Sequence, residues 1–357
     1  MTVSRLEKVR AAMAEAQLDA LLVGRPENRA YLSGFTGSAG LLLITQQDAY
    51  LITDFRYVEQ ASVEAPAFKV CRSDTTPAEL VGKLCQDAGV RRLGFEGDFV
   101  TVDDFQTYRK ALPDQELLSA TGLVEKLRMI KDAEEQALMR RAAAITDEAF
   151  RHILGFIRPG VTERDVALEL EFTIRRLGAQ GLAFETIVAS GPRSSLPHGQ
   201  PTDRVIEEGD LVTLDFGARY QDYCSDMTRT VMVGEPSAKQ REIYEIVLEA
   251  QQRGVAACRP GITGKELDEV CRSYIREKGY GGHFGHGTGH GVGRFIHEGP
   301  RVSTRGEQDV LQPGMVVTIE PGIYLPGWGG VRIEDMVLVT ETGCEVLSRS
   351  PKELIIL

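Results

Sequence analysis

Histidine and glycine are concentrated in one short stretch of this sequence. GHFGHGTGHG, residues 282–291, contains His283, His286 and His290, which are three of the six histidines in the chain, and His297 follows seven residues later. So much glycine disfavours a regular helix, and it lets the backbone bring an imidazole close to a crowded centre. Imidazole is the commonest metal ligand among side chains. Taken alone, His290 in such a loop is more often a structural residue than a ligand, so its interpretation as a metal ligand depends on the carboxylates elsewhere in the chain.

One pair of aspartates has the spacing of hairpin partners. The first predicted β-hairpin has strands at 211–216 and 223–233, and it places Asp215 and Asp226 symmetrically about a turn at Tyr220–Gln221. Directly opposed residues of antiparallel strands have Cβ atoms about 4.5–5.5 Å apart. We therefore expect the two aspartates to be cross-strand neighbours on one face.

A pair of glutamates has the same relation further along the chain. The second predicted hairpin has strands at 316–320 and 331–339 around the turn-rich segment PGIYLPGWGG. Glu320 and Glu334 are symmetric about Gly327, so they too are expected to lie opposite each other.

Like charges that face each other destabilise a sheet unless a cation lies between them. Some of these side chains could instead point to solvent, but the apolar neighbours in LVTLDF and VVTIEP favour interior strands, where an unpaired carboxylate is costly. Two divalent cations would neutralise four carboxylates, with a neutral histidine as the fifth ligand. Oxygen ligands with one imidazole and no thiolate favour Mn²⁺ or Co²⁺, with Zn²⁺ as an alternative.

The segments that carry these residues are repeated. RPGVT at 158–162 matches RPGIT at 259–263, and each threonine is expected to cap a helix together with an acidic residue three positions later. GDLVTLD at 209–215 matches GMVVTIE at 314–320. The repeat predicts a pseudo-two-fold domain with a site between its halves.

Residues 1–122 are predicted to form a separate α/β domain. The expected strands are 18–23, 41–44 and 50–53, and the expected helices are 55–64, 77–88 and 102–110. The glycine-rich loop 34–40 has the spacing GxxGxxG and no following lysine, so a turn between strands is favoured over a nucleotide-binding loop. A long amphipathic helix at 125–156 is expected to join this domain to the rest of the chain.

Composition excludes several classes of function. The net charge of −11 and the pI of about 5.2 argue against nucleic acid as a partner. No apolar run approaches the roughly 18 residues that cross a membrane, and the N-terminal stretch is predicted as an amphipathic helix rather than a signal peptide. The six cysteines form no C-x-x-C pair, so reduced and mostly buried thiols in a cytoplasmic protein are expected.

These motifs together resemble the pita-bread metallopeptidases, the family of methionine aminopeptidase, aminopeptidase P and prolidase. The resemblance rests on LDFG, SDMTRT, GHGTGHGVG, TIEPGIY and VRIED. It implies a creatinase-type α/β domain at 1–122, followed by an α+β pita-bread catalytic domain at 123–357 with an internal pseudo-two-fold repeat. It also implies five ligands for two metal ions. Asp226 and Glu334 would bridge the ions, Asp215 would hold one, and His290 and Glu320 would hold the other.

The resemblance assigns roles to further residues of this domain. His198 and His297 correspond to substrate-facing histidines, although a surface position for His198 and a core position for His297 are the alternatives. His286 is expected to pack behind the ligands. Arg332 would hold either a carboxylate ligand or the substrate. The candidates for the substrate pocket are His283, His286, Tyr324 and Arg332.

The chemistry implied is hydrolysis of peptides that contain proline. The metal pair would lower the pKa of an attacking water, Glu320 would move its proton to the leaving nitrogen, and His198 and His297 would bind the developing oxyanion. YLSGFTGSAG and TDFRYVEQA resemble aminopeptidase P more than prolidase, so an Xaa-Pro aminopeptidase is favoured. An Xaa-Pro dipeptidase is the alternative.

Other members of the family are disfavoured. Methionine aminopeptidases lack the N-terminal domain, creatinase lacks the five-ligand set, and non-catalytic pita-bread proteins that serve as binding modules lose ligands. A homodimer or a higher homo-oligomer is expected.

Overall fold

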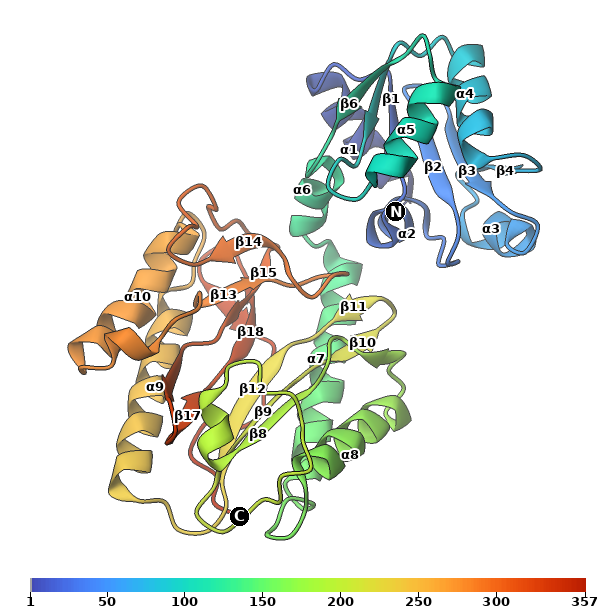
Figure 1. The fold of residues 1–357 in the computed structure, drawn as a ribbon. Coiled ribbons are helices and arrows are strands. Elements are labelled where there is room, and N and C mark those ends of the chain that lie inside the picture. The colour runs from blue at the N-terminus through green and yellow to red at the C-terminus, as the bar shows by residue number, and fades with distance from the viewer. Residues whose placement is uncertain (1) are drawn as a thin grey trace. The chain divides into compact units, whose positions relative to one another are not determined.

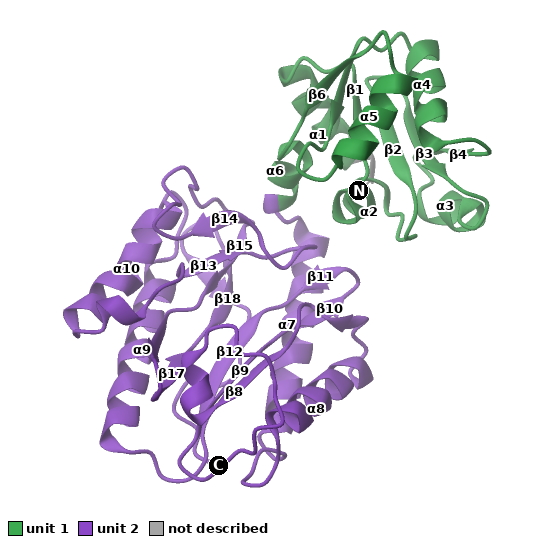
Figure 2. Ribbon diagram, in the orientation of Figure 1, with its two compact units in different colours: residues 1–128 green, residues 129–357 purple. Residues whose placement is uncertain are grey.

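The computed structural model describes residues 2–357, and the chain divides into two compact units, Met1–Arg128 and Met129–Leu357 (Figure 2). The domain boundary after residue 122 that the sequence indicates stays a prediction. Among the helices of the described chain, none combines the length and apolar character that a membrane-spanning segment needs. The six cysteines are unpaired, and four of them are buried.

The first unit is built around a six-stranded mixed sheet with the order β4-β3-β2-β1-β5-β6 (Figure 1). Its strands are β1 (Ala20–Val23), β2 (Leu41–Thr45), β3 (Ala49–Thr53), β4 (Lys69–Arg72), β5 (Arg92–Phe95) and β6 (Glu116–Ser119). Its helices are α1 (Thr2–Glu15), α2 (Pro26–Ser33), α3 (Val58–Glu64), α4 (Pro77–Asp87), α5 (Val102–Ala111) and α6 (Leu123–Met129). Apolar side chains of alternate residues form a core on each face of the sheet.

Two expectations for this part of the chain are wrong in detail. The loop 34–40 follows helix α2 rather than a strand, since Pro26 begins a helix that the sequence patterns did not indicate. The long helix expected at 125–156 is interrupted after Met129. Asp132 begins a new helix there, because its carboxylate accepts hydrogen bonds from the backbone N–H groups of Glu134 and Glu135, both at 3.0 Å.

The second unit carries four long helices and four sheets of two to five strands, whose arrangement Figure 1 shows. Its helices are α7 (Ala133–Ile153), α8 (Glu163–Arg176), α9 (Ala238–Ala257) and α10 (Gly264–Glu277), with the short 3₁₀ helices η1 (Gly191–Ser195) and η2 (Gly281–His283). The first group of strands is β7 (Gly181–Leu182), β8 (Ile187–Ser190), β9 (Leu211–Phe216), β10 (Ala218–Tyr220), β11 (Tyr223–Cys224) and β12 (Met227–Met232). The second group is β13 (Gly289–Gly291), β14 (Glu298–Val302), β15 (Val316–Ile319), β16 (Gly322–Leu325), β17 (Gly329–Arg332), β18 (Asp335–Val339) and β19 (Cys344–Val346).

The internal repeat is visible in this unit. Helices α7 and α8 pack on the sheet β12-β9-β8, and α9 and α10 pack on the sheet that contains β13-β15-β18 (Figure 1). The two threonines expected to cap helices do so. Thr162 accepts from Asp165 N at the start of α8, and Thr263 accepts from Glu266 N at the start of α10. Each half therefore has its own apolar core, and the carboxylates lie on strands or directly beside strand ends between the two cores.

Candidate metal centre

The first hairpin carries two aspartates on one face, with a register that differs from the predicted one. Asp215 pairs with Thr228 across β9 and β12, so Asp226 is its diagonal neighbour rather than its direct partner. The turn is centred on Gln221–Asp222, whose φ angles are 45° and 66°, one residue beyond the expected centre. A turn displaced by one residue shifts the register by two. Because side chains alternate between faces with a period of two, both aspartates still point to the same side.

The register of the second hairpin agrees with the prediction. The pairs Ile319 with Asp335 and Gly322 with Arg332 place Glu320 opposite Glu334. Asp335 points to the other face, where Arg229 donates to it at 2.8 Å. Glu334 is therefore the residue of the Glu-Asp pair that faces Asp215 and Asp226.

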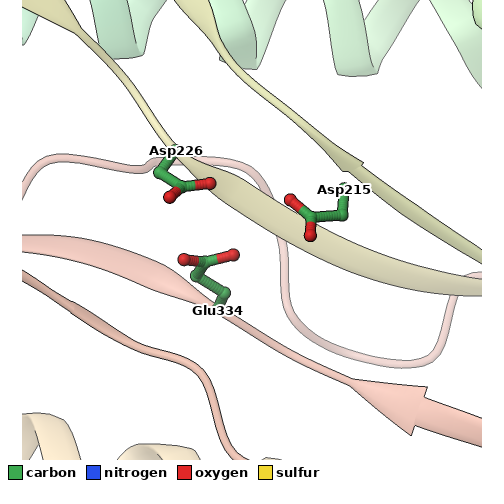
Figure 3. Close-up of side chains that lie close together, drawn as sticks. All are labelled: Asp215, Asp226 and Glu334. Atoms are coloured by element: carbon green, nitrogen blue, oxygen red, sulfur yellow. The ribbon is translucent and has the colours of Figure 1, made fainter. Parts of the chain in front are cut away.

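Three carboxylates from the two hairpins converge on one point. Asp215, Asp226 and Glu334 each offer an oxygen within 4.8 Å of the others, and Figure 3 shows the three groups turned toward one another. Asp226 is 5% exposed and Glu334 is 1% exposed. One oxygen of Asp215, Oδ1, is buried without a hydrogen-bond partner among the described residues. A buried acceptor without a donor is unusual in proteins, and here it faces other acceptors.

His290 joins this cluster to the fourth carboxylate. Its Nε2 lies 3.5 Å from Asp226 Oδ2 and 3.5 Å from Glu320 Oε1, while its Nδ1 lies 3.1 Å from the carbonyl of Gly291. A carbonyl only accepts, so Nδ1 carries the proton and the lone pair of Nε2 faces the carboxylates.

The glycines beside His290 are needed for close contact between backbones. A Cβ at Gly289 would lie 2.0 Å from Thr318 O, and one at Gly291 would lie 2.0 Å from Gly299 O. Strand β13 can therefore approach its neighbours only with glycine on both sides of the histidine. This is the physical reason for the sequence GHG.

The electrostatics of the cluster disfavour four charged carboxylates without a cation. Burial raises the pKa of Asp226 and of Glu334 well above the usual range, and the neighbouring carboxylates raise both further. Burial raises the pKa of Glu320 to about 8 and lowers the pKa of His290 to about 4. A neutral imidazole and clustered carboxylates are the protonation states and ligand types that a divalent cation takes. The unpartnered Asp215 Oδ1 fits the same interpretation.

Arg332 donates hydrogen bonds to protein groups on the same face of the hairpins as the carboxylate cluster. Its Nη2 donates to Asp215 Oδ2 at 2.6 Å, and its Nε donates to Thr228 Oγ1 at 3.0 Å. Nη1 donates to the hydroxyl of Tyr324 at 2.8 Å, and that hydroxyl lies 2.8 Å from His286 Nε2. Of the two roles considered for Arg332, the geometry supports holding a carboxylate ligand. Tyr324 and His286 in turn hold Arg332.

The sequence patterns did not single out Thr228. Its hydroxyl donates to Glu334 Oε2 at 2.7 Å while it accepts from Arg332. The signal was present in SDMTRT, because Thr228 stands two positions after Asp226 and so shares its face of the strand.

The carboxylates line a cavity of about 240 Å³. Its wall includes His198, His286, His290, His297 and Arg332, with apolar surface from Phe184, Ile187, Pro197 and Ile296. The rings of His290 and His297 are in edge contact, with centroids 4.4 Å apart. His283 is not among the lining residues. It is exposed on η2, and its nearest described aromatic contact is Tyr280 at 6.4 Å.

Comparison with known proteins identifies both parts of the chain. Residues 137–341 match metallopeptidase family M24, and residues 5–130 match the creatinase/prolidase N-terminal domain. The solved structure of an Xaa-Pro dipeptidase from Bacillus anthracis is 52% identical, covers 100% of both chains and superposes with a TM-score of 0.98. An Xaa-Pro dipeptidase of Pyrococcus furiosus is 42% identical over 98% of this chain and 99% of its own length. An X-Pro aminopeptidase from Thermotoga maritima is 41% identical over 99% of both chains, with a TM-score of 0.92.

These matches confirm the expected fold, a creatinase-type domain followed by a pita-bread catalytic domain. The chain is a peptidase and belongs to metallopeptidase family M24.

Proposed function

We propose that this protein is an Xaa-Pro dipeptidase, which hydrolyses the bond between a residue and a following C-terminal proline. The observation that carries the proposal is the 52% identity and the TM-score of 0.98 to a structure named Xaa-Pro dipeptidase. The P. furiosus relative bears the same name. These comparisons favour the dipeptidase over the aminopeptidase that the N-terminal motifs favoured.

The aminopeptidase remains the second candidate, since the T. maritima relative carries that name at 41% identity.

Five side chains would hold two divalent cations. They are Asp215, Asp226, His290, Glu320 and Glu334, and Mn²⁺ would be the preferred metal for this set of oxygens and one imidazole. Cations of this kind supply Lewis-acid polarisation of a carbonyl and a water of lowered pKa.

The protein's own groups would position the substrate and move its proton. Glu320, whose Oε1 lies 3.5 Å from Nε2 of His290 beside the cluster, can take a proton from the nucleophile and give it to the proline nitrogen. That nitrogen has no N–H in the substrate, so it must receive a proton to leave as an amine. His198 and His297 line the cavity and can donate hydrogen bonds to the carbonyl oxygen as it gains charge.

The test is a panel of matched peptides with the Mn²⁺-loaded enzyme. Leu-Pro and Ala-Pro would be compared with Leu-Pro-Gly and Ala-Pro-Gly, and products would be separated by chromatography. A dipeptidase should cleave only the first two. Cleavage of the tripeptides at the Xaa-Pro bond would replace the proposal by the aminopeptidase, and cleavage of none would reject both.

A further inference from the structure

One buried glutamate binds both ends of the loop that carries His198. Glu163, the first residue of α8, is 0% exposed. Its Oε1 accepts from the backbone N–H and the hydroxyl of Ser190, at 2.8 and 2.9 Å. Its Oε2 accepts from the backbone N–H and the hydroxyl of Thr202, at 3.0 and 2.7 Å. Residues 190–202, which we call the His198 loop, are therefore closed at their base by a single carboxylate.

An arginine inside the loop completes this arrangement. Arg193 Nε lies 3.1 Å from Glu163 Oε2, and Arg193 Nη2 donates to Gln200 O at 2.7 Å. After Ser190, which ends β8, the only regular structure in the loop is η1. These bonds therefore help to fix where its tip lies, together with the bond from Gly330 N to Ser194 Oγ at 2.9 Å. At the tip, Pro197 O accepts from Arg332, and His198 lines the cavity.

The internal repeat indicates that Glu163 is not needed to begin the helix. Its counterpart at the start of α10 is Gly264, and the threonine before each of them caps its helix in the same way. At Gly264 a Cβ would lie 1.8 Å from Arg301 O, so that half has no room for a side chain. The glutamate therefore occurs only in the half whose loop must present His198.

We propose that Glu163 is a positioning residue that acts on the reaction through His198. The inference rests on the proposed role of His198 in substrate binding. Its physical basis is charge-assisted hydrogen bonding. A buried carboxylate with several donors holds its partners more firmly than a neutral amide can. A small displacement of a catalytic group costs up to about 100-fold in rate.

The test is a double-mutant cycle between Glu163→Gln and His198→Ala. Turnover would be measured on the Xaa-Pro peptide that the unaltered enzyme cleaves fastest, together with metal content and melting temperature. We expect Glu163→Gln alone to lower kcat about 10- to 100-fold, with little change in metal content. In the His198→Ala background the same change should alter kcat by less than about twofold, while lowering the melting temperature as much as before.

A matched control is Glu135→Gln. Glu135 is also buried at a helix start, where it accepts from Tyr223 at 2.6 Å. Glu135→Gln should change kcat by the same factor in the enzyme with His198 and in the His198→Ala variant.

Each outcome separates the two hypotheses. If His198→Ala leaves turnover intact, both the proposed role of His198 and this inference are wrong. If His198→Ala is damaging and Glu163→Gln lowers kcat equally in both backgrounds, or not at all, only the inference is wrong. Should Glu163→Gln fail to fold, Thr202→Val removes one donor to the carboxylate and enters the same cycle.

Discussion

The two halves of the catalytic unit have the same frame, but they place different side chains at equivalent positions. Asp215 on β9 and Glu320 after β15 occupy matching places in the repeat. Across from them stand Thr228 in the first half and Glu334 in the second. One step further along the same face, the first half has Asp226 where the second half has Arg332.

These differences at equivalent positions explain why two halves with the same backbone arrangement can form a single asymmetric metal centre. Thr228 and Glu334, which occupy equivalent positions, bond each other at 2.7 Å where the halves meet. Arg332 stands where symmetry would place another acid, and it holds Asp215 at 2.6 Å instead. A fifth carboxylate at that point would add repulsion to a cluster whose pKa values are already raised. The two halves therefore share one backbone arrangement, and different side chains at single equivalent positions give each half a different role at the centre.

Removal of the cations should affect both halves at once and gives the largest expected effect. Each half contributes two carboxylates, which repel each other without a cation. Chelation should abolish turnover and lower the melting temperature, and Mn²⁺ should restore both. A ligand at 100 times its Kd stabilises a fold by about 2.7 kcal/mol. Thermal unfolding of the two forms is the measurement. A metal-free protein that melts no lower than the loaded one would contradict the stabilising role.

Substitutions of the adjacent residues Glu334 and Asp335 can test which of the two faces the carboxylate cluster. Asp226→Ala and Glu334→Gln should each abolish turnover and reduce bound metal, because both groups lie in the cluster. Asp335→Asn is the matched control. Asp335 is buried on the opposite face with Arg229 and Lys352, so its loss should lower stability and leave metal content unchanged. Metal analysis of the folded variants is the readout. Metal loss in Asp335→Asn alone would reverse the assignment.

The faces of these hairpins could be predicted from sequence, but one of the two registers could not. Gly327 marks the centre of the second turn and has a φ of 76°, a conformation that glycine adopts readily. The first turn places Gln221 and Asp222 in the same left-handed region. Glutamine gives little sign of such a turn, so the sequence pattern predicts a turn centre one residue too early.

Other features depend on contacts that a pattern in one segment does not reveal. The break before α7 is signalled locally by Asp132 and Glu135, a capping pair that the amphipathic pattern obscured. Glu163 had a signal only in the comparison of the two repeats, where it stands against Gly264. The pocket role predicted for His283 rested on its neighbours in sequence, and its exposed position on η2 follows from the path of the loop.

His198 and His297 come one from each half and should have effects of similar size. Each lines the cavity without belonging to the carboxylate cluster. His198→Ala and His297→Ala should retain metal and lose about 10²–10³ in kcat, the usual cost of one donor to an oxyanion. Steady-state kinetics with metal analysis is the measurement. Near-normal turnover in both variants would mean that neither histidine binds the reacting group.

Arg332 distinguishes the halves most directly, and its replacement should have an intermediate effect. Arg332→Gln removes the charged donor to Asp215, and loss of a partner that orients a ligand typically costs about 10–100-fold in metal affinity or activity. We expect weaker Mn²⁺ binding with KM for the peptide less affected, measured by metal titration and kinetics. Tyr324→Phe, which removes only the hydroxyl between Arg332 and His286, is the milder control. A large rise in KM with unchanged metal affinity would instead assign Arg332 to the substrate.

The smallest effect should come from the positions where the halves are alike. Thr162 and Thr263 each cap a helix within a capping box, with bonds of 3.1 and 3.2 Å to the third residue of the helix. Loss of such a cap costs about 1 kcal/mol, or about 2–4 °C in melting temperature for a unit of this size. Thr162→Ala and Thr263→Ala should therefore lower the melting temperature equally and leave kcat unchanged. A selective loss of kcat in Thr162→Ala would show that the start of α8 itself controls the His198 loop, since Thr162 immediately precedes Glu163. The capping threonines would then be equivalent in stability but unequal in function.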